Sequence, residues 1–324
     1  MRKNSVLFVG LAVFCLVSTC AAKDNEVPQP VERAHWIYYF DDPTFVKVAD
    51  KVLDTVRPQL IRLLGDSLSY RPSIYIVNSN ARFQQLVQTK FPDWGAGAAI
   101  PLHKMIVIKS PHLFNINKPI EELLAHEYAH LALHERTGFH EPPRWFDEGL
   151  AMYVSTEWSW SDYLALSKAS IFGQILPLDS IEYLNRFNES QAHVAYAESY
   201  LATRYFYEEY TAKSVQVFLD SIRAGESVSD ALVASTGSNY REFDREVRLY
   251  IQKHYNISTL FMDTMFLWAG LALIVLIGVY VSFKKRRQYY KKWEREERLQ
   301  SSDFDYGDPD NPEHVDDEDE PWRN

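Results

Sequence analysis

Two histidines stand four residues apart in the segment AHEYAH, residues 125–130, and a glutamate directly follows the first of them. If residues 120–134 are helical, positions i and i+4 lie on one face, one turn apart, so His126 and His130 can reach the same metal ion. Glu127 is offset around the helix and can reach a water on that metal without being a ligand. This is the arrangement that the H-E-x-x-H motif requires for zinc chemistry.

Helix signals surround this motif. A proline, Pro119, stands at the start, two glutamates follow in the first turn, and Gly138 stands at the end. These are ordinary start and stop signals of a helix. Leucines and an isoleucine at helical spacing supply an apolar face. The sequence therefore predicts a helix that carries both histidines.

A catalytic zinc site needs a third protein ligand and one open position. His134 lies one further turn along the same helix, which carries it away from the metal, and His140 has no supporting context. Glu148 follows the helix breakers in the segment PPRWFDEGLAMYVS, residues 142–155, which predicts a second helix. The linker is long enough to bring this second helix back against the first. Asp147 is a neighbouring competitor for the third position.

The two segments LLAHEYAHLALHERTG and PPRWFDEGLAMYV together resemble the gluzincin metalloproteases, in particular the peptidase MA-like family. In that family the first motif is followed, on the next helix, by W-x-x-E-G-[LF]-A. The matching residues here, in order, are Trp145, Glu148, Gly149, Leu150 and Ala151. The resemblance is sharp over 120–155 and looser over 35–255. It implies that Zn²⁺ is bound by His126, His130 and Glu148, that Glu127 is the general base, and that the substrate is a peptide or protein.

A hydrolytic zinc site also needs a donor for the oxyanion of the tetrahedral intermediate. Related gluzincins supply a tyrosine or histidine from a later helix. The segment HVAYAESYLATRYFYEEY, residues 193–210, resembles that helix. We expect Tyr196 to be the oxyanion donor, with Tyr200 and His193 as the next candidates. The alternative is that these tyrosines are half-buried packing residues.

The fold class expected from the resemblance is α+β. A thermolysin-like zincin domain, with a small mixed sheet and zinc-binding helices, is followed by a mainly helical subdomain and a C-terminal transmembrane helix. In gluzincins the edge strand of the sheet borders the substrate, so either Ala96–Ala99 or the 105–109 strand is expected to line the cleft. The segment GAGAA has no acidic residue where the alanyl-aminopeptidase type has a glutamate, which favours an endopeptidase.

The chain divides into four predicted parts. Residues 1–22 have a basic start and an apolar core, as in a signal peptide, an uncleaved anchor or a lipoprotein signal ending at Cys20. Residues 23–258 form the metallopeptidase domain, 259–283 a transmembrane helix, and 284–324 a basic, then acidic, disordered tail. The only cysteines are Cys15 and Cys20, so no disulfide framework is expected.

The predicted topology follows from residues 264–283, which are uncharged over twenty positions and are followed at once by KKRRQYYKK. Basic residues beside a span favour the cytoplasmic side, so the C-terminus is expected to be cytoplasmic and the large domain extracytoplasmic. A cysteine-free exported domain fits the periplasmic side of a bacterial inner membrane. The acidic tail could bind a cytoplasmic partner, although charge runs need none. A net charge of −10 argues against nucleic-acid binding.

One rival to the protease hypothesis is a catalytically silent, membrane-anchored peptide-binding or scaffold protein that retains the fold. A silent relative would typically have lost the base or a ligand, whereas Glu127 and all three predicted ligands are present here. A second rival is a zinc-free helical protein with accidental histidines, which metal analysis would exclude.

Overall fold

We describe the chain from a computed structural model, which covers residues 30–40, 44–88, 95–114, 116 and 118–299. The predicted N-terminal segment 1–22 and the acidic end of the tail lie outside these residues. The chain forms two compact units, Met1–Ile257 and Ser258–Asn324, and each is described by itself.

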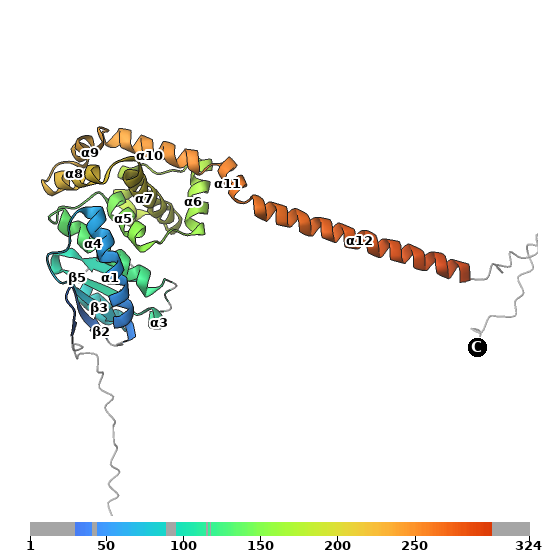
Figure 1. Ribbon diagram of the computed structural model, residues 1–324, viewed down its shortest axis with the longest axis horizontal. Helices are drawn as coiled ribbons and strands as arrows, with labels where there is room; N and C mark the ends of the chain where they lie inside the picture. The colour runs from blue at the N-terminus through green and yellow to red at the C-terminus, as the bar shows by residue number, and fades with distance from the viewer. Residues whose placement is uncertain (1–29, 41–43, 89–94, 115, 117, 300–324) are drawn as a thin grey trace, which may run out of the picture. The chain divides into compact units, whose positions relative to one another are not determined.

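The first unit contains a five-stranded mixed sheet in the order β1-β2-β3-β5-β4. Figure 1 labels its three central strands β2, β3 and β5. The strands are β1 Val31–Glu32, β2 Ile37–Phe40, β3 Ser73–Val77, β4 Gly97–Ile100 and β5 Met105–Lys109. The three central strands β2, β3 and β5 are parallel, and β1 and β4 pair antiparallel at the two edges. The predicted small mixed sheet is therefore confirmed, with β4 as an edge strand and β5 inside.

Both faces of the sheet are covered by helices. Along β5 the side chains alternate, so Ile106 and Ile108 enter the main core while Met105 and Val107 join a smaller core with Phe83. The main core is shared with two long helices, α1 Thr44–Leu64 and α4 Ile120–Arg136, and the smaller core with α2 Asn80–Val87. The helix expected over 120–134 is α4.

The rest of the unit is helical. The elements are η1 Pro101–His103, α3 Pro111–Phe114, α5 Arg144–Ser155, α6 Trp160–Ile171, η2 Leu178–Arg186, α7 Glu189–Glu209, α8 Ala212–Arg223, α9 Val228–Thr236 and α10 Tyr240–His254. Helix α5 packs against both α4 and α7. Trp145 anchors it, because its fully buried indole lies 5.3–6.5 Å from the rings of Phe146, Phe206, Phe218 and Phe243.

A glycine permits the close crossing of α5 and α7. A Cβ atom at Gly149 would lie 2.1 Å from the carbonyl oxygen of Ser199 and 2.2 Å from Oγ1 of Thr203. No other residue fits this position without moving one helix. The glycine that follows Glu148 in the motif therefore sets how closely the helix carrying this carboxylate approaches α7.

The second unit begins just after the start of α11 Ile257–Asp263 and contains α12 Met265–Leu299. Within the described part of the chain, α12 is the one helix long and apolar enough to cross a membrane, with a mean hydropathy of 2.3 over an 18-residue window. The prediction that disorder begins at 284 is wrong, because residues 284–299 continue α12. This stretch is rich in Lys, Arg and Glu, which favour helix, and Lys292 pairs with Glu296 one turn on.

Candidate metal centre

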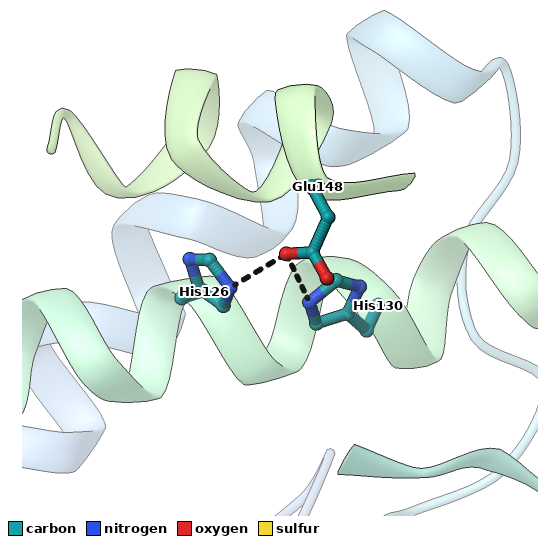
Figure 2. Close-up of side chains that lie close together, drawn as sticks. All are labelled: His126, His130 and Glu148. Carbon is teal, nitrogen blue, oxygen red and sulfur yellow. Dashed lines mark ion pairs between the residues drawn. The ribbon is translucent and has the colours of Figure 1, made fainter. Parts of the chain in front are cut away.

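Helix α4 presents two imidazoles to one carboxylate of α5. The rings of His126 and His130 lie 4.9 Å apart between centroids. Oε2 of Glu148 is 3.6 Å from Nε2 of His126 and 3.8 Å from Nε2 of His130. Figure 2 shows this carboxylate reaching from the neighbouring helix toward both rings. One ligand atom from each residue falls within a cluster no wider than 4.8 Å.

The two distances from the Glu148 oxygen to the histidine nitrogens fit a zinc ion. Zinc bonds to nitrogen and oxygen of about 2.0–2.2 Å, in tetrahedral geometry, place two ligand atoms roughly 3.4 Å apart. The observed distances of 3.6 and 3.8 Å are close to this value. Two histidines and a glutamate are also the donor set of one class of catalytic zinc site, in which a fourth position takes water. The residues present therefore fit the metal that the motif implies.

Asp147 lies on the far side of one imidazole instead of competing as a ligand. Nδ1 of His130 donates to Oδ1 of Asp147 at 2.6 Å, and Nε2 of His134 lies 3.4 Å from the other oxygen. His140 is bonded to the backbone of Thr137. The other candidates for the third metal ligand, Asp147, His134 and His140, are thus each engaged in other contacts.

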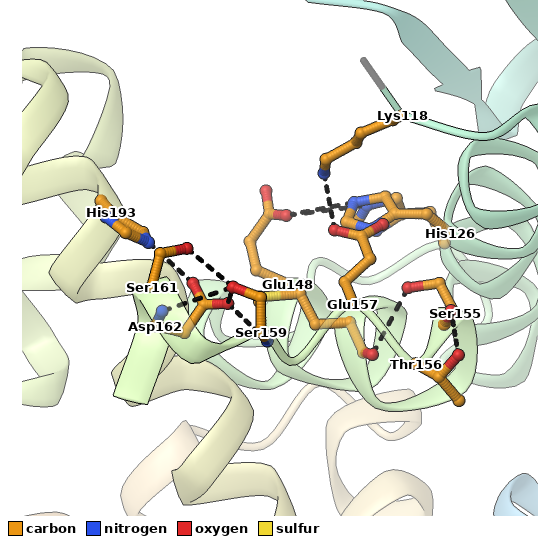
Figure 3. A network of polar contacts seen from close by, with 12 residues as sticks. Lys118, His126, Glu148, Ser155, Thr156, Glu157, Ser159, Ser161, Asp162 and His193 are labelled. Atoms are coloured by element: carbon orange, nitrogen blue, oxygen red, sulfur yellow. Dashed lines mark hydrogen bonds and ion pairs between the residues drawn. The ribbon is translucent and has the colours of Figure 1, made fainter. Parts of the chain in front are cut away.

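A second carboxylate supports the other imidazole. Nδ1 of His126 lies 2.9 Å from Oε1 of Glu157, and Nζ of Lys118 lies 2.7 Å from Oε2 of the same carboxylate. Figure 3 shows Lys118, Glu157 and His126 in this order beside Glu148. With each Nδ1 within 3 Å of a carboxylate oxygen, each Nε2 is left to face Glu148. Carboxylates behind metal-ligating histidines fix both tautomer and ring orientation.

Arg144 determines which oxygen of Glu148 is available. Its Nη2 lies 2.6 Å from Oε1 of Glu148, one turn along α5. The backbone N–H of Arg144 donates to Glu182, which fixes the start of the helix. Because Oε1 is engaged by the guanidinium, Oε2 is the oxygen that faces the two histidines.

Opposite charges outweigh burial at this site. Burial acts to lower the pKa of His126, but the carboxylates of Glu148 and Glu157 raise it to about 10. The pKa of His130 is also raised, against burial, by Asp147 and Glu148. Burial alone would raise the pKa of Glu157, yet His126 and Lys118 lower it to about 2. In the metal-free chain both histidines therefore bind a proton more tightly than a free imidazole does, and a metal ion competes with that proton.

Glu127 faces the edge strand of the sheet. A Cβ atom at Gly97 would lie 2.7 Å from Oε1 of Glu127, so a glycine in β4 makes room for this carboxylate. Burial raises the pKa of Glu127, while His126 and His130 lower it and the backbone of Ala99 hydrogen-bonds to it. A buried carboxylate with a raised pKa beside a metal site is suited to accept a proton.

The three candidates on α7 have different surroundings. Burial raises the pKa of Tyr196 and the charge of Glu148 adds to this effect, which places the phenol near the triad. Tyr200 instead stacks on Trp158 at 4.7 Å, lies 6.1 Å from the ring of Tyr153, and hydrogen-bonds to Arg204. Nε2 of His193 is paired with Asp162 at 2.7 Å (Figure 3). The catalytic roles of all three stay predictions, and the charges around Tyr196 favour it over Tyr200.

Sequence reasoning missed Glu157, Lys118 and Arg144. Arg144 carried a signal, since it stands four residues before Glu148 on one helix and such pairs meet. Glu157 carried none, because it follows Thr156, a residue in the left-handed conformation at φ 59° that ends α5. The direction of the chain after that turn depends on tertiary packing.

Comparison with known proteins agrees with this site. The sequence model of the Peptidase MA superfamily matches residues 56–253, which is more than half of the chain and includes both helices of the triad. A search of curated proteins gave no significant match. On the extent of the family match and the grouping of His126, His130 and Glu148, this chain belongs to the Peptidase MA superfamily.

Proposed function

We propose that this chain is a zinc-dependent peptidase of the gluzincin type, held at a membrane by α12. The observation that carries the proposal is the convergence of Nε2 of His126, Nε2 of His130 and Oε2 of Glu148, with a separate carboxylate, Glu127, beside them. The arrangement of a small sheet, α4 and α5 suits a thermolysin-like zincin domain.

The proposed chemistry is hydrolysis of a peptide bond. When bound, zinc would polarise the scissile carbonyl and make a water acidic enough to ionise near neutral pH. Glu127 takes the proton of the attacking water and delivers it to the leaving nitrogen, which its raised pKa favours. Tyr196 stays a neutral phenol because its pKa is raised, so it can donate a hydrogen bond to the oxyanion.

The edge strand β4 is the proposed substrate contact. One side of β4 pairs with β5, and the other side is the edge of the sheet among the described strands. A peptide in extended form can add to such an edge through main-chain hydrogen bonds. No acidic side chain stands in β4 to hold a free amino group, which supports an endopeptidase.

Membrane anchoring rests on α12. Its apolar part is long enough to cross about 30 Å of hydrocarbon, and the basic residues that follow favour a cytoplasmic C-terminus. The domain that contains the triad would then act on the extracytoplasmic side, on the periplasmic face of an inner membrane. Substrates would be peptides or proteins close to that membrane.

The test uses the full chain in detergent, purified with zinc, as wild type, Glu127→Gln and His126→Ala. We expect about one zinc per wild-type chain, cleavage of internal bonds in a mixed peptide library, and retained zinc without cleavage in Glu127→Gln. His126→Ala should lose zinc. Zinc binding without any cleavage by wild type would favour the silent binding protein, and a wild type without zinc would remove the proposal entirely.

A further inference from the structure

Helix α6 turns an apolar stripe toward solvent. Trp160, Leu164, Ile171 and Phe172 are 52%, 41%, 37% and 68% exposed. Their spacing puts them on one side of the helix, at successive turns and at its C-terminal cap. Lys168 is the charged residue exposed on this side, whereas Asp162 is buried in the N-terminal capping box. We call these five exposed residues, Trp160, Leu164, Lys168, Ile171 and Phe172, the α6 face.

An aromatic stack connects the α6 face to the point where the chain leaves the first unit. Trp160 stacks on Tyr163 with ring centroids 4.9 Å apart, and Tyr163 lies 5.4 Å from the ring of Tyr255. Tyr255 is the buried C-terminal cap of α10, and the ring centroid of Trp158 also lies 6.1 Å from that of Tyr255. The stack fixes the end of the first unit beside the start of α6.

The chain between this point and the apolar helix is short. Nine residues, Asn256 to Thr264, separate Tyr255 from the first residue of α12, and seven of the residues from Ile257 onward form α11. Even fully extended, nine residues reach only about 30 Å, and a helical stretch reaches less than half of that per residue. If α12 crosses a membrane, as the proposed function has it, Tyr255 is tethered within this reach of the start of α12, and the α6 face begins beside Tyr255 in the same unit.

We propose that the α6 face inserts into the lipid–water interface of the membrane that α12 crosses. Tryptophan is the side chain that favours this interface, and leucine, isoleucine and phenylalanine supply apolar area that water otherwise contacts. Lys168 lies on the same side and can pair with lipid phosphate while its stem stays in the apolar layer. This inference rests on the membrane anchoring in the proposed function and adds a second attachment to it.

The test uses the full chain with Cys15→Ser and Cys20→Ser, reconstituted in vesicles of phosphatidylcholine and phosphatidylglycerol. A single cysteine carries an environment-sensitive fluorophore at Leu164→Cys, or at Phe172→Cys in a second protein. The matched control is Val233→Cys, at a site 48% exposed on α9. Leu273→Cys within α12 reports the anchor itself. Brominated lipids quench a fluorophore only where it reaches the acyl chains.

We expect at least twofold quenching at positions 164, 172 and 273 and little at 233. Quenching at 273 alone would overturn the α6 proposal and leave the anchor standing. No quenching at 273 would refute the anchor, and the α6 proposal with it. A blue-shifted but unquenched fluorophore at 164 would mean that protein covers the face, which also overturns the proposal.

A charge variant provides the second test. With the fluorophore on Ser161→Cys, an exposed neighbour, the pair Leu164→Glu and Phe172→Glu should remove at least half of the quenching. Val233→Glu should leave it unchanged, because that residue is not part of the α6 face. Equal quenching in both variants would contradict insertion of this face.

Discussion

The carboxylates behind the two histidines should set zinc affinity, and their separate contributions can be measured. Asp147→Asn and Glu157→Gln keep shape while removing the charge that faces each Nδ1. Loss of such a partner typically weakens metal binding about 10- to 100-fold, which is roughly 1.4–2.7 kcal/mol. Asp147 is the closer partner at 2.6 Å against 2.9 Å, and Glu157 is shared with Lys118. We therefore expect Asp147→Asn to lie nearer the upper value and Glu157→Gln nearer the lower one.

The assay is competition for zinc between the purified full chain and a chromophoric chelator of known affinity, at fixed pH. Because both imidazoles face the same oxygen of Glu148, the two sites are coupled, and the double variant should depart from the product of the two single effects. Thermal unfolding of the metal-free proteins checks that each variant is folded, so that a change in affinity reports on the site.

Glu182→Gln is the matched control. Glu182 is an acid close to the site that accepts the backbone N–H of Arg144 at 2.8 Å, and it contacts neither histidine in the described structure. Its neutralisation removes the same charge without removing an imidazole partner. The reasoning is refuted if Asp147→Asn binds zinc within about threefold of wild type, or if Glu182→Gln weakens binding as much as Asp147→Asn does.

Two further predictions concern the helices that hold the site. Gly149→Ala should lower the free energy of unfolding by about 1–3 kcal/mol and weaken zinc binding, because the new Cβ would lie 2.1 Å from the Ser199 carbonyl oxygen and α5 must shift. Thermal unfolding and zinc titration measure these two effects. An unchanged melting temperature would contradict the prediction. Burial raises the pKa of Glu198, which accepts the backbone N–H of Leu176, to about 8. Between pH 4.5 and about 8 the folded chain holds a proton on Glu198 that the unfolded chain has released. The free energy of unfolding should therefore fall by about 1.4 kcal/mol for each unit by which the pH rises in this range. Glu198→Gln should abolish this component in urea unfolding at pH 5.5 and 7.5, and an identical pH dependence in both proteins would show that Glu198 does not cause it.

The triad was predictable because its geometry is mostly local. His126 and His130 are one turn apart on any α-helix, prolines marked the start of both helices, and a glycine marked the end of α4. The choice between Asp147 and Glu148 was less accessible, since adjacent residues differ by only about 100° around a helix. In the structure that rotation directs one carboxylate to the Nε2 atoms and the other to an Nδ1 atom.

Features that depend on distant parts of the chain could not be predicted. The sequence left open whether the strand at 96–99 or the one at 105–109 borders the substrate, because strand order follows from long-range pairing. The structure puts β4 at the edge. The helical extension of α12 beyond Phe283 was missed for another reason. Its high charge suggested disorder, but the same Lys, Arg and Glu residues are good helix formers.

The charges around the triad explain why this cluster is suited to a divalent ion. Three buried acids, Glu127, Asp147 and Glu148, surround it together with the half-buried Glu157, while Arg144 and Lys118 supply two fixed positive charges. With all four acids ionised, two negative charges remain without a partner. Protons on His126 and His130 can supply both, in line with the raised pKa values of these two histidines. One divalent cation supplies the same two positive charges while both imidazoles are neutral, which is the form in which they bind a metal. Zinc and the two protons therefore balance the same two negative charges and exclude each other.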